Sequence, residues 1–391
     1  MGLEGINLLD VNMFVQGREY DAFRRLRDEA PVYFHREPDG PGFHAVTRFD
    51  DVVDVVRRPL VFCSGGGTQI QNRKAEGHGT ASVHNSDPPY HTQLRNAVLP
   101  SFRAGLMQNL TPKIRATVQR LIDDCPRGEP FDFVAHFAVK LPMMVIGDLM
   151  GVPAADQPDM VNWANAISNV LASEAQQAEA RQALFQFFRR LVALKRREPA
   201  DDLATILAKA DIDGRPLTES ELDAYFIVLS AAGNETTRFL LSGGLEQLCL
   251  APEHMEFLRR SPQRLPVAVE EMVRFISPVM QMRRTATQDS EIAGAPVRKG
   301  DKVVVYFASG NRDERKFSDP EAFRPSRNEG LHMGFGNGIH FCIGAHLARL
   351  ETQIFFEELF QRTGEVSLAG RGERLPSYLF HGHTRLPVAW S

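Results

Sequence analysis

The feature that most constrains the fold is a long, mainly apolar segment that begins after residue 218 and runs to about residue 249. Its start, Thr218-Glu-Ser-Glu221, has the form of a capping box, in which two side chains satisfy the backbone N–H groups at the start of a helix. A helix of roughly 30 residues is about 45 Å long, which is enough to cross a whole domain. Because the segment is apolar on most sides, we expect a buried central helix.

Helical periodicity also dominates elsewhere, and strand patterns are few and short. Helices are predicted at residues 21–28, 50–56, 111–124, 181–196 and 267–276, and from residue 345 onward. Strands are predicted at residues 301–307 and 386–390, and residues 31–35 and 42–47 are predicted to form a hairpin. Residues 64–86 and 311–329 are predicted to be long irregular segments. No break in composition divides the chain, so residues 1–391 are expected to form a single domain, mainly α with a small β part.

Charge and composition exclude several classes of protein. The net charge is −4, with acidic and basic residues mixed along the chain, so the basic stripe of a nucleic-acid-binding protein is lacking. The first 17 residues contain Glu4 and Asp10 and no long apolar run, so we expect neither a signal peptide nor a membrane anchor. The cysteines are too far apart in sequence for a zinc site or a disulfide framework, which fits a cytoplasmic protein. They are Cys63, Cys125, Cys249 and Cys342.

The most unusual segment is Phe335-Gly-Asn-Gly-Ile-His-Phe-Cys342-Ile-Gly344. A helical pattern follows it, so Cys342 is expected at the start of a helix, where free N–H groups and the helix dipole favour negative charge. We expect this environment to lower the thiol pKa and to make Cys342 a good anionic metal ligand. Gly338 and Gly344 would leave room for a flat macrocycle against the loop.

These residues alone leave three other interpretations open. A buried structural cysteine does not explain the spacing of the glycines. A cysteine nucleophile at a helix start is reasonable, although no partner base is indicated. A phosphate-binding loop could use the Gly-x-Gly spacing, but the Gly-Lys-Ser/Thr ending is absent.

The middle of the long helix reads Ala231-Ala232-Gly233-Asn-Glu235-Thr236-Thr. Glycine, a carboxylate and two threonines in a buried helix go against local preference, and such inconsistencies tend to mark functional sites. Thr236 can donate a hydrogen bond to the carbonyl of Ala232 and loosen the helix there. The alternative is that Glu235 is an ordinary solvated residue, since exposed helical glutamates are common.

Together, Phe335, Gly338, His340, Cys342 and Gly344 resemble the haem-binding loop of the cytochrome P450 family, and the resemblance extends over nearly the whole chain. It is closest to soluble bacterial members, and it implies the triangular, mainly α-helical family fold with a long central helix. The implied cofactor is haem b (iron protoporphyrin IX), held through its iron by the thiolate of Cys342.

The second match is the central helix, whose middle resembles the family's oxygen-activation motif. The resemblance implies that Gly233 leaves space beside the cofactor, that Thr236 hydrogen-bonds dioxygen, and that Glu235 helps to relay protons from solvent.

Further matches imply structural and cofactor-binding roles. Glu271 and Arg274, three residues apart on a helix, resemble the family's Glu-x-x-Arg pair, which Arg327 would complete; as an isolated pair they could equally be a surface ion pair. Four basic residues at matching places would face the haem propionates, although each alone could be a surface charge. They are His91, Arg95, Arg284 and His340.

The expected reaction is therefore hydroxylation of a hydrophobic small molecule, such as a sterol or a terpenoid, with dioxygen. Electrons are expected from a separate ferredoxin and its reductase, docked where Arg95, Arg103 and Arg349 could contribute positive charge. Candidate substrate contacts lie in residues 64–86 and 165–174, together with Ala231, Ala232, Val279, Met280, Met282, Leu379 and Phe380. Alternatives are a peroxide-driven hydroxylase, a haem protein that binds ligands without turnover, and a thiol hydrolase that uses Cys342.

Overall fold

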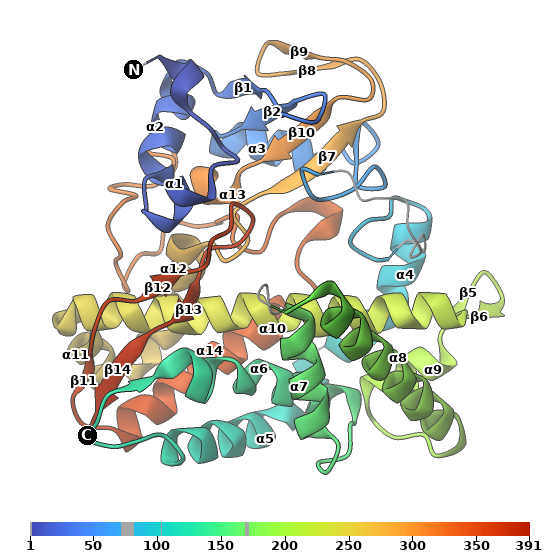
Figure 1. Cartoon of the computed structure of the whole chain (residues 1–391), viewed down its shortest axis with the longest axis vertical. Coiled ribbons are helices and arrows are strands. Elements are labelled where there is room, and N and C mark those ends of the chain that lie inside the picture. Colours follow the sequence, from blue (N-terminus) through green and yellow to red (C-terminus); the bar gives the residue numbers. More distant parts are fainter. Residues whose placement is uncertain (1, 72–81, 103, 169–171) are drawn as a thin grey trace.

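Helix α10 (Glu219–Leu250) crosses the middle of the molecule, between a β-rich part and a set of helices (Figure 1). The capping box at its start is present. The Thr218 hydroxyl accepts a hydrogen bond from Glu221 N at 3.2 Å, and the Glu221 carboxylate accepts one from Thr218 N at 2.7 Å. Side chains along its whole length are buried, from Leu222 to Leu248. The prediction of a long, buried central helix is thus confirmed.

The computed structural model describes residues 2–71, 82–102, 104–168 and 172–391, and helices account for most of its regular structure. Those on the far side of α10 from the large sheet include α5, α6, α8 and α14 (Figure 1). The helices are α1 (Val11–Val15), α2 (Glu19–Glu29), α3 (Phe49–Arg57), α4 (Tyr90–Val98), α5 (Ala104–Asp123), α6 (Lys140–Met150), α7 (Gln157–Ser168), α8 (Glu174–Arg197), α9 (Leu203–Lys209), α11 (Pro252–Arg260), α12 (Leu265–Ile276), α13 (Phe307–Gly310) and α14 (Ala345–Arg362).

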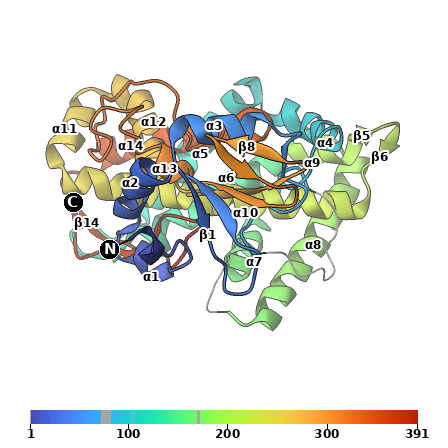
Figure 2. The same ribbon diagram turned by 90° about the horizontal axis from the view of Figure 1, so that it is seen from above.

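The main sheet has the strand order β1-β2-β10-β7-β3 and lies beside α2 and α3 (Figures 1 and 2). The predicted hairpin is confirmed, because β1 and β2 pair antiparallel. β10 then pairs parallel with β2 and antiparallel with β7. The strands of this sheet are β1 (Val32–His35), β2 (Phe43–Val46), β3 (Phe62–Cys63), β7 (Met282–Ala286) and β10 (Lys302–Val305).

Smaller sheets complete the β part, which confirms the prediction of a mainly α fold with little β structure. The C-terminal strand predicted at residues 386–390 is β14, which pairs with β11 and β4. The remaining strands are β4 (Phe131–Asp132), β5 (Asp211–Ile212), β6 (Arg215–Pro216), β8 (Ser290–Ile292), β9 (Ala295–Val297), β11 (Val366–Leu368), β12 (Glu373–Arg374), β13 (His383–Arg385) and β14 (Pro387–Trp390).

Some element boundaries differ from those predicted. The strand predicted at residues 301–307 ends at Val305, because Phe307 begins α13. The helix predicted at 181–196 begins at Glu174, where Ser173 and Gln176 form a capping box. The helix predicted at 111–124 begins at Ala104 and continues through Pro112. Proline is favoured in the first turn of a helix, so at this position it suggests a helix start that the packed structure overrides.

A buried ion cluster holds the irregular segment that precedes Cys342. Arg274 Nε donates to Glu271 Oε2 at 2.7 Å, and Arg327 Nε donates to Glu271 Oε1 at 3.1 Å. Both guanidinium groups also donate to backbone carbonyls of the irregular segment, including Asn311 O, Ser318 O and Ala322 O. Residues 311–329 contain no helix or strand, as predicted, so these side-chain contacts replace the missing backbone pairing.

Within the described residues, no helix combines the length and the hydropathy needed to cross a bilayer.

The ion cluster predicts a large stability effect for Glu271→Ala. Removing the carboxylate leaves two buried guanidinium groups without a counter-charge, which costs about 3–5 kcal/mol. We expect a correspondingly lower free energy of unfolding in urea. Glu256→Ala, which breaks an exposed pair with Arg260, is the control and should change that free energy by less than about 1 kcal/mol. Equal effects of the two substitutions would contradict this interpretation.

Candidate functional site

The loop before α14 is shaped by two glycines that touch other elements. Gly338 has φ +70°, and a Cβ atom there would lie 2.5 Å from the carbonyl oxygen of Val56 at the end of α3. A Cβ atom on Gly334 would lie 2.4 Å from a methyl carbon of Val273 in α12. The expectation that Gly338 leaves room for a macrocycle is therefore wrong, because the backbone of α3 occupies that space. Gly344 does face the Cys342 sulfur, which lies 4.0 Å from the position of its Cβ.

Cys342 stands at the end of this loop, just before α14 begins at Ala345, as predicted. Its N–H donates to Phe335 O at 2.9 Å, so the loop closes on itself. Its side chain is exposed to an internal cavity and lies deep in the protein. We expected the helix start to lower the pKa of the thiol. Instead, burial raises that pKa, and the Gly344 N–H and the charges of Arg95 and Arg349 only partly offset it.

The raised thiol pKa has a simple consequence for the kind of ligand that fits beside Cys342. A buried thiolate needs a counter-charge in direct contact, and a coordinated metal cation supplies one strongly enough to displace the thiol proton. The cavity in front of the sulfur, with the open space beside Gly344, therefore fits a metal-centred cofactor.

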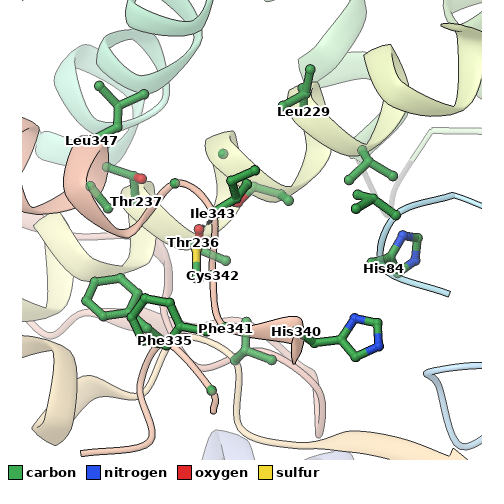
Figure 3. Close-up of a pocket in the computed structure, with 18 of the residues that line it drawn as sticks. His84, Leu229, Thr236, Thr237, Phe335, His340, Phe341, Cys342, Ile343 and Leu347 are labelled. Carbon is green, nitrogen blue, oxygen red and sulfur yellow. Dashed lines mark hydrogen bonds between the residues drawn. The ribbon is translucent and has the colours of Figure 1, made fainter. Parts of the chain in front are cut away.

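The cavity has a volume of about 300 Å³ and lies between α10 and the loop that carries Cys342 (Figure 3). Most of its lining side chains are apolar, and the polar ones are few. The predicted site residues that line it are Arg95, Ala232, Gly233, Thr236, Val279, Met282, Arg284, Phe335, His340, Cys342 and Gly344. Of the described parts of residues 64–86 and 165–174, Thr68, Val83 and His84 line it. Residues 72–81 and 169–171 lie outside the described structure.

Four predicted substrate contacts do not line the cavity. Ala231 is exposed, but it lies off the face of α10 that carries Ala232, Gly233 and Thr236, because successive helical residues are rotated by about 100°. Met280 is 1% exposed and packs in the N-terminal part of the core, between the cavity residues Val279 and Met282.

The other two predicted contacts, Leu379 and Phe380, lie in the C-terminal loop, which contributes no side chain to the cavity. The carbonyl of Leu379 accepts a hydrogen bond from Met280 N at 2.9 Å. Phe380 forms an isolated β-bridge with Val279, and its ring centre lies 6.1 Å from that of Phe239. Both residues thus support the cavity wall from behind.

The polar segment of α10 has the local geometry expected for Thr236. Its hydroxyl donates to Ala232 O at 2.7 Å, which confirms the predicted bond, and its side chain lines the cavity. Gly233 allows close packing, because a Cβ atom there would lie 2.6 Å from the Ile146 side chain. Glu235 lies outside the cavity lining, 3.6 Å from Arg238, and its side chain is only 17% exposed. It is therefore a partly buried, ion-paired group and not a fully solvated one.

Basic residues gather at one end of the cavity. The rings of His91 and His340 have their centres 4.2 Å apart, and Arg95 donates to Phe341 O at 2.7 Å. Arg284 is 6% exposed and donates to the carbonyl of Arg283. His91 is buried behind His340, outside the cavity lining, and neither of its ring nitrogens has a hydrogen-bond partner within the described part of the chain.

The pKa shifts show that the charged forms of two of these basic residues are disfavoured. Burial lowers the pKa of Arg284 to about 10. Burial, followed by the charges of Arg284, His91 and Arg95, lowers the pKa of His340 to about 2. Asp87, whose charge favours the protonated forms of Arg284 and His91, is already engaged by Ser64 N and Gly65 N. A ligand with carboxylate groups would relieve this repulsion, so the cluster fits the propionates of haem.

Polar cavity residues that the sequence reasoning did not single out include Thr237 and Glu351, and His84 was covered only as part of the range 64–86. Burial raises the pKa of Glu351 well above its usual value, which favours the protonated form of this acid. The sequence spacing could have indicated Glu351, because it follows the cavity residue Leu347 by four positions and therefore lies on the same face of α14. His84 lies in the long irregular segment, where no periodic pattern indicates which side chains point inward.

Comparisons with known proteins agree with this geometry. Residues 43–364 match the family model described as Cytochrome P450. The chain is 36% identical to linalool 8-monooxygenase of Pseudomonas putida, over 99% of each chain. It is 37% identical to methyl-branched lipid omega-hydroxylase of Mycobacterium tuberculosis, over 95% of this chain and 90% of that protein. A cytochrome P450 of Mycobacterium marinum, solved in complex with pseudoionone, superposes with a TM-score of 0.91 at 35% identity, over 98% of each chain.

The site predicts that Cys342→Ala removes the axial thiolate. Protein loaded with haem should then lose the red-shifted Soret band that the reduced carbon-monoxide complex shows when sulfur is the ligand. Cys249→Ala, at a cysteine outside the cavity lining, should keep that band. Retention of the band in Cys342→Ala would point to another ligand.

Proposed function

Because the chain belongs to the cytochrome P450 family of haem monooxygenases, we propose that it hydroxylates a hydrophobic terpenoid, sterol or methyl-branched lipid. We further propose that residues 1–391 act as one monooxygenase domain and take electrons from a ferredoxin and its reductase. The reaction converts R–H, dioxygen, two electrons and two protons into R–OH and water.

The observation that carries this proposal is the apolar cavity that holds both Cys342 and Thr236. Its walls beyond these residues are mainly aliphatic, with Val228 and Leu229 on α10 and Leu347 on α14 (Figure 3). Apolar walls favour a substrate that gains free energy by leaving water, at about 25 cal/mol for each Å² buried. The names of the similar enzymes, which specify linalool and a methyl-branched lipid, agree with that chemistry.

In this proposal, the chain's own residues hold the cofactor at its two charged ends. Cys342 would ligate the iron, and Arg95, Arg284 and His340 would bind the propionates, with His91 supporting His340 from behind. When bound, haem held by a cysteine thiolate would supply the activation of dioxygen. The protein then has to place the substrate, limit the entry of water and deliver protons.

Proton delivery would depend on Thr236 and Glu235. The Thr236 hydroxyl is held by Ala232 O, and turning it toward the cavity breaks one hydrogen bond at a cost of about 1 kcal/mol. Glu235 lies one residue away, at the boundary between the protein interior and solvent, and is paired with Arg238. A carboxylate that exchanges its ionic partner for a proton can pass that proton inward, which suits a relay from solvent to the Thr236 hydroxyl.

We propose that ferredoxin docks on the side of the molecule where the Cys342 loop reaches the surface. Arg57 at the end of α3 is exposed there, and it donates to the Asn337 side chain at 3.2 Å. Arg95 and Arg349, which we expected at this surface, are instead engaged by Phe341 O and Glu270. Arg103 lies outside the described residues.

Thr236→Ala should uncouple electron use from product formation. A positioned proton donor is commonly worth about 100-fold in rate, so its loss leaves time for reduced oxygen to escape as hydrogen peroxide. The measurement is product and peroxide formed per electron consumed, with haem content and substrate binding unchanged. Ser242→Ala is the matched control, because Ser242 also donates back to a carbonyl of α10, that of Phe239, but lies outside the cavity lining. Unchanged coupling in Thr236→Ala would contradict the assigned role.

Ala232→Phe should weaken substrate binding, because the added ring fills the cavity. Forcing extra volume into a packed site costs about 1–3 kcal/mol, which corresponds to roughly tenfold or more in Kd. Binding can be followed as a shift of the Soret band on titration with linalool, pseudoionone, a methyl-branched fatty acid or cholesterol. Ala231→Phe, at the adjacent residue outside the cavity lining, should leave Kd unchanged. No Soret shift with any of these compounds would contradict the proposed substrate class.

A further inference from the structure

Two consecutive glutamates on α12 have different partners. Glu271 belongs to the buried cluster with Arg274 and Arg327. Glu270 contacts the other side, where it binds His332 in the segment before the Cys342 loop and Arg349 on α14. We propose that Glu270 is a positioning residue for the axial thiolate, acting by balancing the charge of Arg349 and by holding His332.

The contact with Arg349 brings a charge pair next to the loop. Arg349 Nε donates to Glu270 Oε1 at 2.5 Å, and Arg349 Nη2 donates to Glu270 Oε2 at 2.9 Å. The guanidinium carbon of Arg349 lies 4.5 Å from the ring centre of Phe335. Phe335 in turn accepts the backbone hydrogen bond of Cys342. The ion pair is therefore two contacts away from the residue that carries the sulfur.

The contact with His332 fixes the start of the loop. Gly334 N donates to His332 Nδ1 at 3.1 Å, so Nδ1 carries no proton. The proton of the neutral ring must then be on Nε2, which donates to Glu270 Oε2 at 3.0 Å. His332 is 7% exposed, and Gly334 has no room for a side chain beside Val273. One carboxylate thus orients the ring that holds the first turn of the loop.

The charge state of Glu270 supports this role. Burial raises the pKa of Glu270, but the hydrogen bonds from His332 and Arg349 outweigh it and bring the pKa to about 2. The Glu270 carboxylate is therefore ionised at working pH. Its negative charge balances the positive charge of Arg349, and the neutral ring of His332 adds no charge to this group of three side chains.

Removing the negative charge has a predictable electrostatic result. An uncompensated Arg349 would withdraw electron density from the thiolate and favour uptake of an electron at the bound haem, so the reduction potential would rise. Glu270 and Arg349 are both about one-third exposed, with 38% and 31% of their side-chain surface accessible, so solvent reduces the size of this shift but not its sign. Partners of metal ligands commonly tune the metal in this way.

The test is a set of charge variants measured by reductive titration of the haem-loaded protein without substrate. Glu270→Gln keeps the shape and removes the charge, so the potential should become more positive than that of the unmodified protein. Arg349→Gln should make it more negative. The double variant restores the local net charge and should return the potential close to the starting value. Glu256→Gln, in an exposed pair with Arg260 on α11, is the matched control and should leave the potential unchanged.

Two results would overturn the proposal. One is a potential for Glu270→Gln equal to that of Glu256→Gln. The other is a double variant whose potential lies no closer to the starting value than that of either single variant, as expected if the contacts only stabilise the fold. If Glu270→Gln does not take up haem, the test depends on Arg349→Gln alone. An unchanged reduction potential of Arg349→Gln would then contradict the proposal. This proposal rests on the ligation of haem by Cys342 that the proposed function includes. Because the measurement involves neither substrate nor ferredoxin, its failure can be told apart from an error in the proposed substrate class or electron donor.

Discussion

The site depends on the ionic contact between Glu271 and the guanidinium groups of Arg274 and Arg327. Residues 311–329 contain no helix or strand, yet this segment leads to the loop that carries Cys342. Its carbonyl groups are bound by two buried arginines, and those arginines are held by one carboxylate on α12. A backbone without regular structure is thus fixed by three side chains, and the cost of burying their charges is offset by complete hydrogen bonding.

The site as a whole is organised around charges that the folded chain does not satisfy by itself. Burial and the charge of Arg284 lower the pKa of His340, and the nearby His91 has no hydrogen-bond partner among the described residues. The thiol of Cys342 is buried so that its anion is disfavoured. A metal cation at the sulfur and carboxylates at the basic cluster would relieve both conditions. The need to balance buried charge therefore explains both the iron and the propionates of the haem cofactor of this family. The residues that create this need lie on different elements.

Much of the fold could be predicted from the sequence, because its strongest signals are local. The capping box and apolar pattern of α10, the hairpin of β1 and β2, and the helix after Cys342 all follow from periodicities within short windows. The identities of the cavity residues were harder to predict. Met280 does not line the cavity, although Val279 and Met282 do, because its own side chain packs in a core cluster formed mainly by the N-terminal segment.

Other features of the site depend on contacts between distant residues, which no local pattern shows. Gly338 is required by the carbonyl of Val56, which lies more than half the length of the chain earlier in the sequence. The raised thiol pKa of Cys342 depends on how deeply the loop is buried, which a helix start alone does not reveal. The contacts of Glu270 with His332 and Arg349 join three separate segments, and adjacent glutamates on a helix give no sign that their partners differ.

The parallel pairing of β2 with β10 has a consequence for how the protein matures. Residues 43–46 lie beside residues 302–305, so the main sheet closes only after about three quarters of the chain has been synthesised. Contacts so far apart in sequence form slowly, because a large loss of chain entropy precedes any gain from pairing. Val56, near the end of α3, must already be in place before Gly338 can pack against its carbonyl. We therefore expect the thiolate loop to take its final shape late in folding, so that haem is captured by a nearly complete protein and not by the nascent chain.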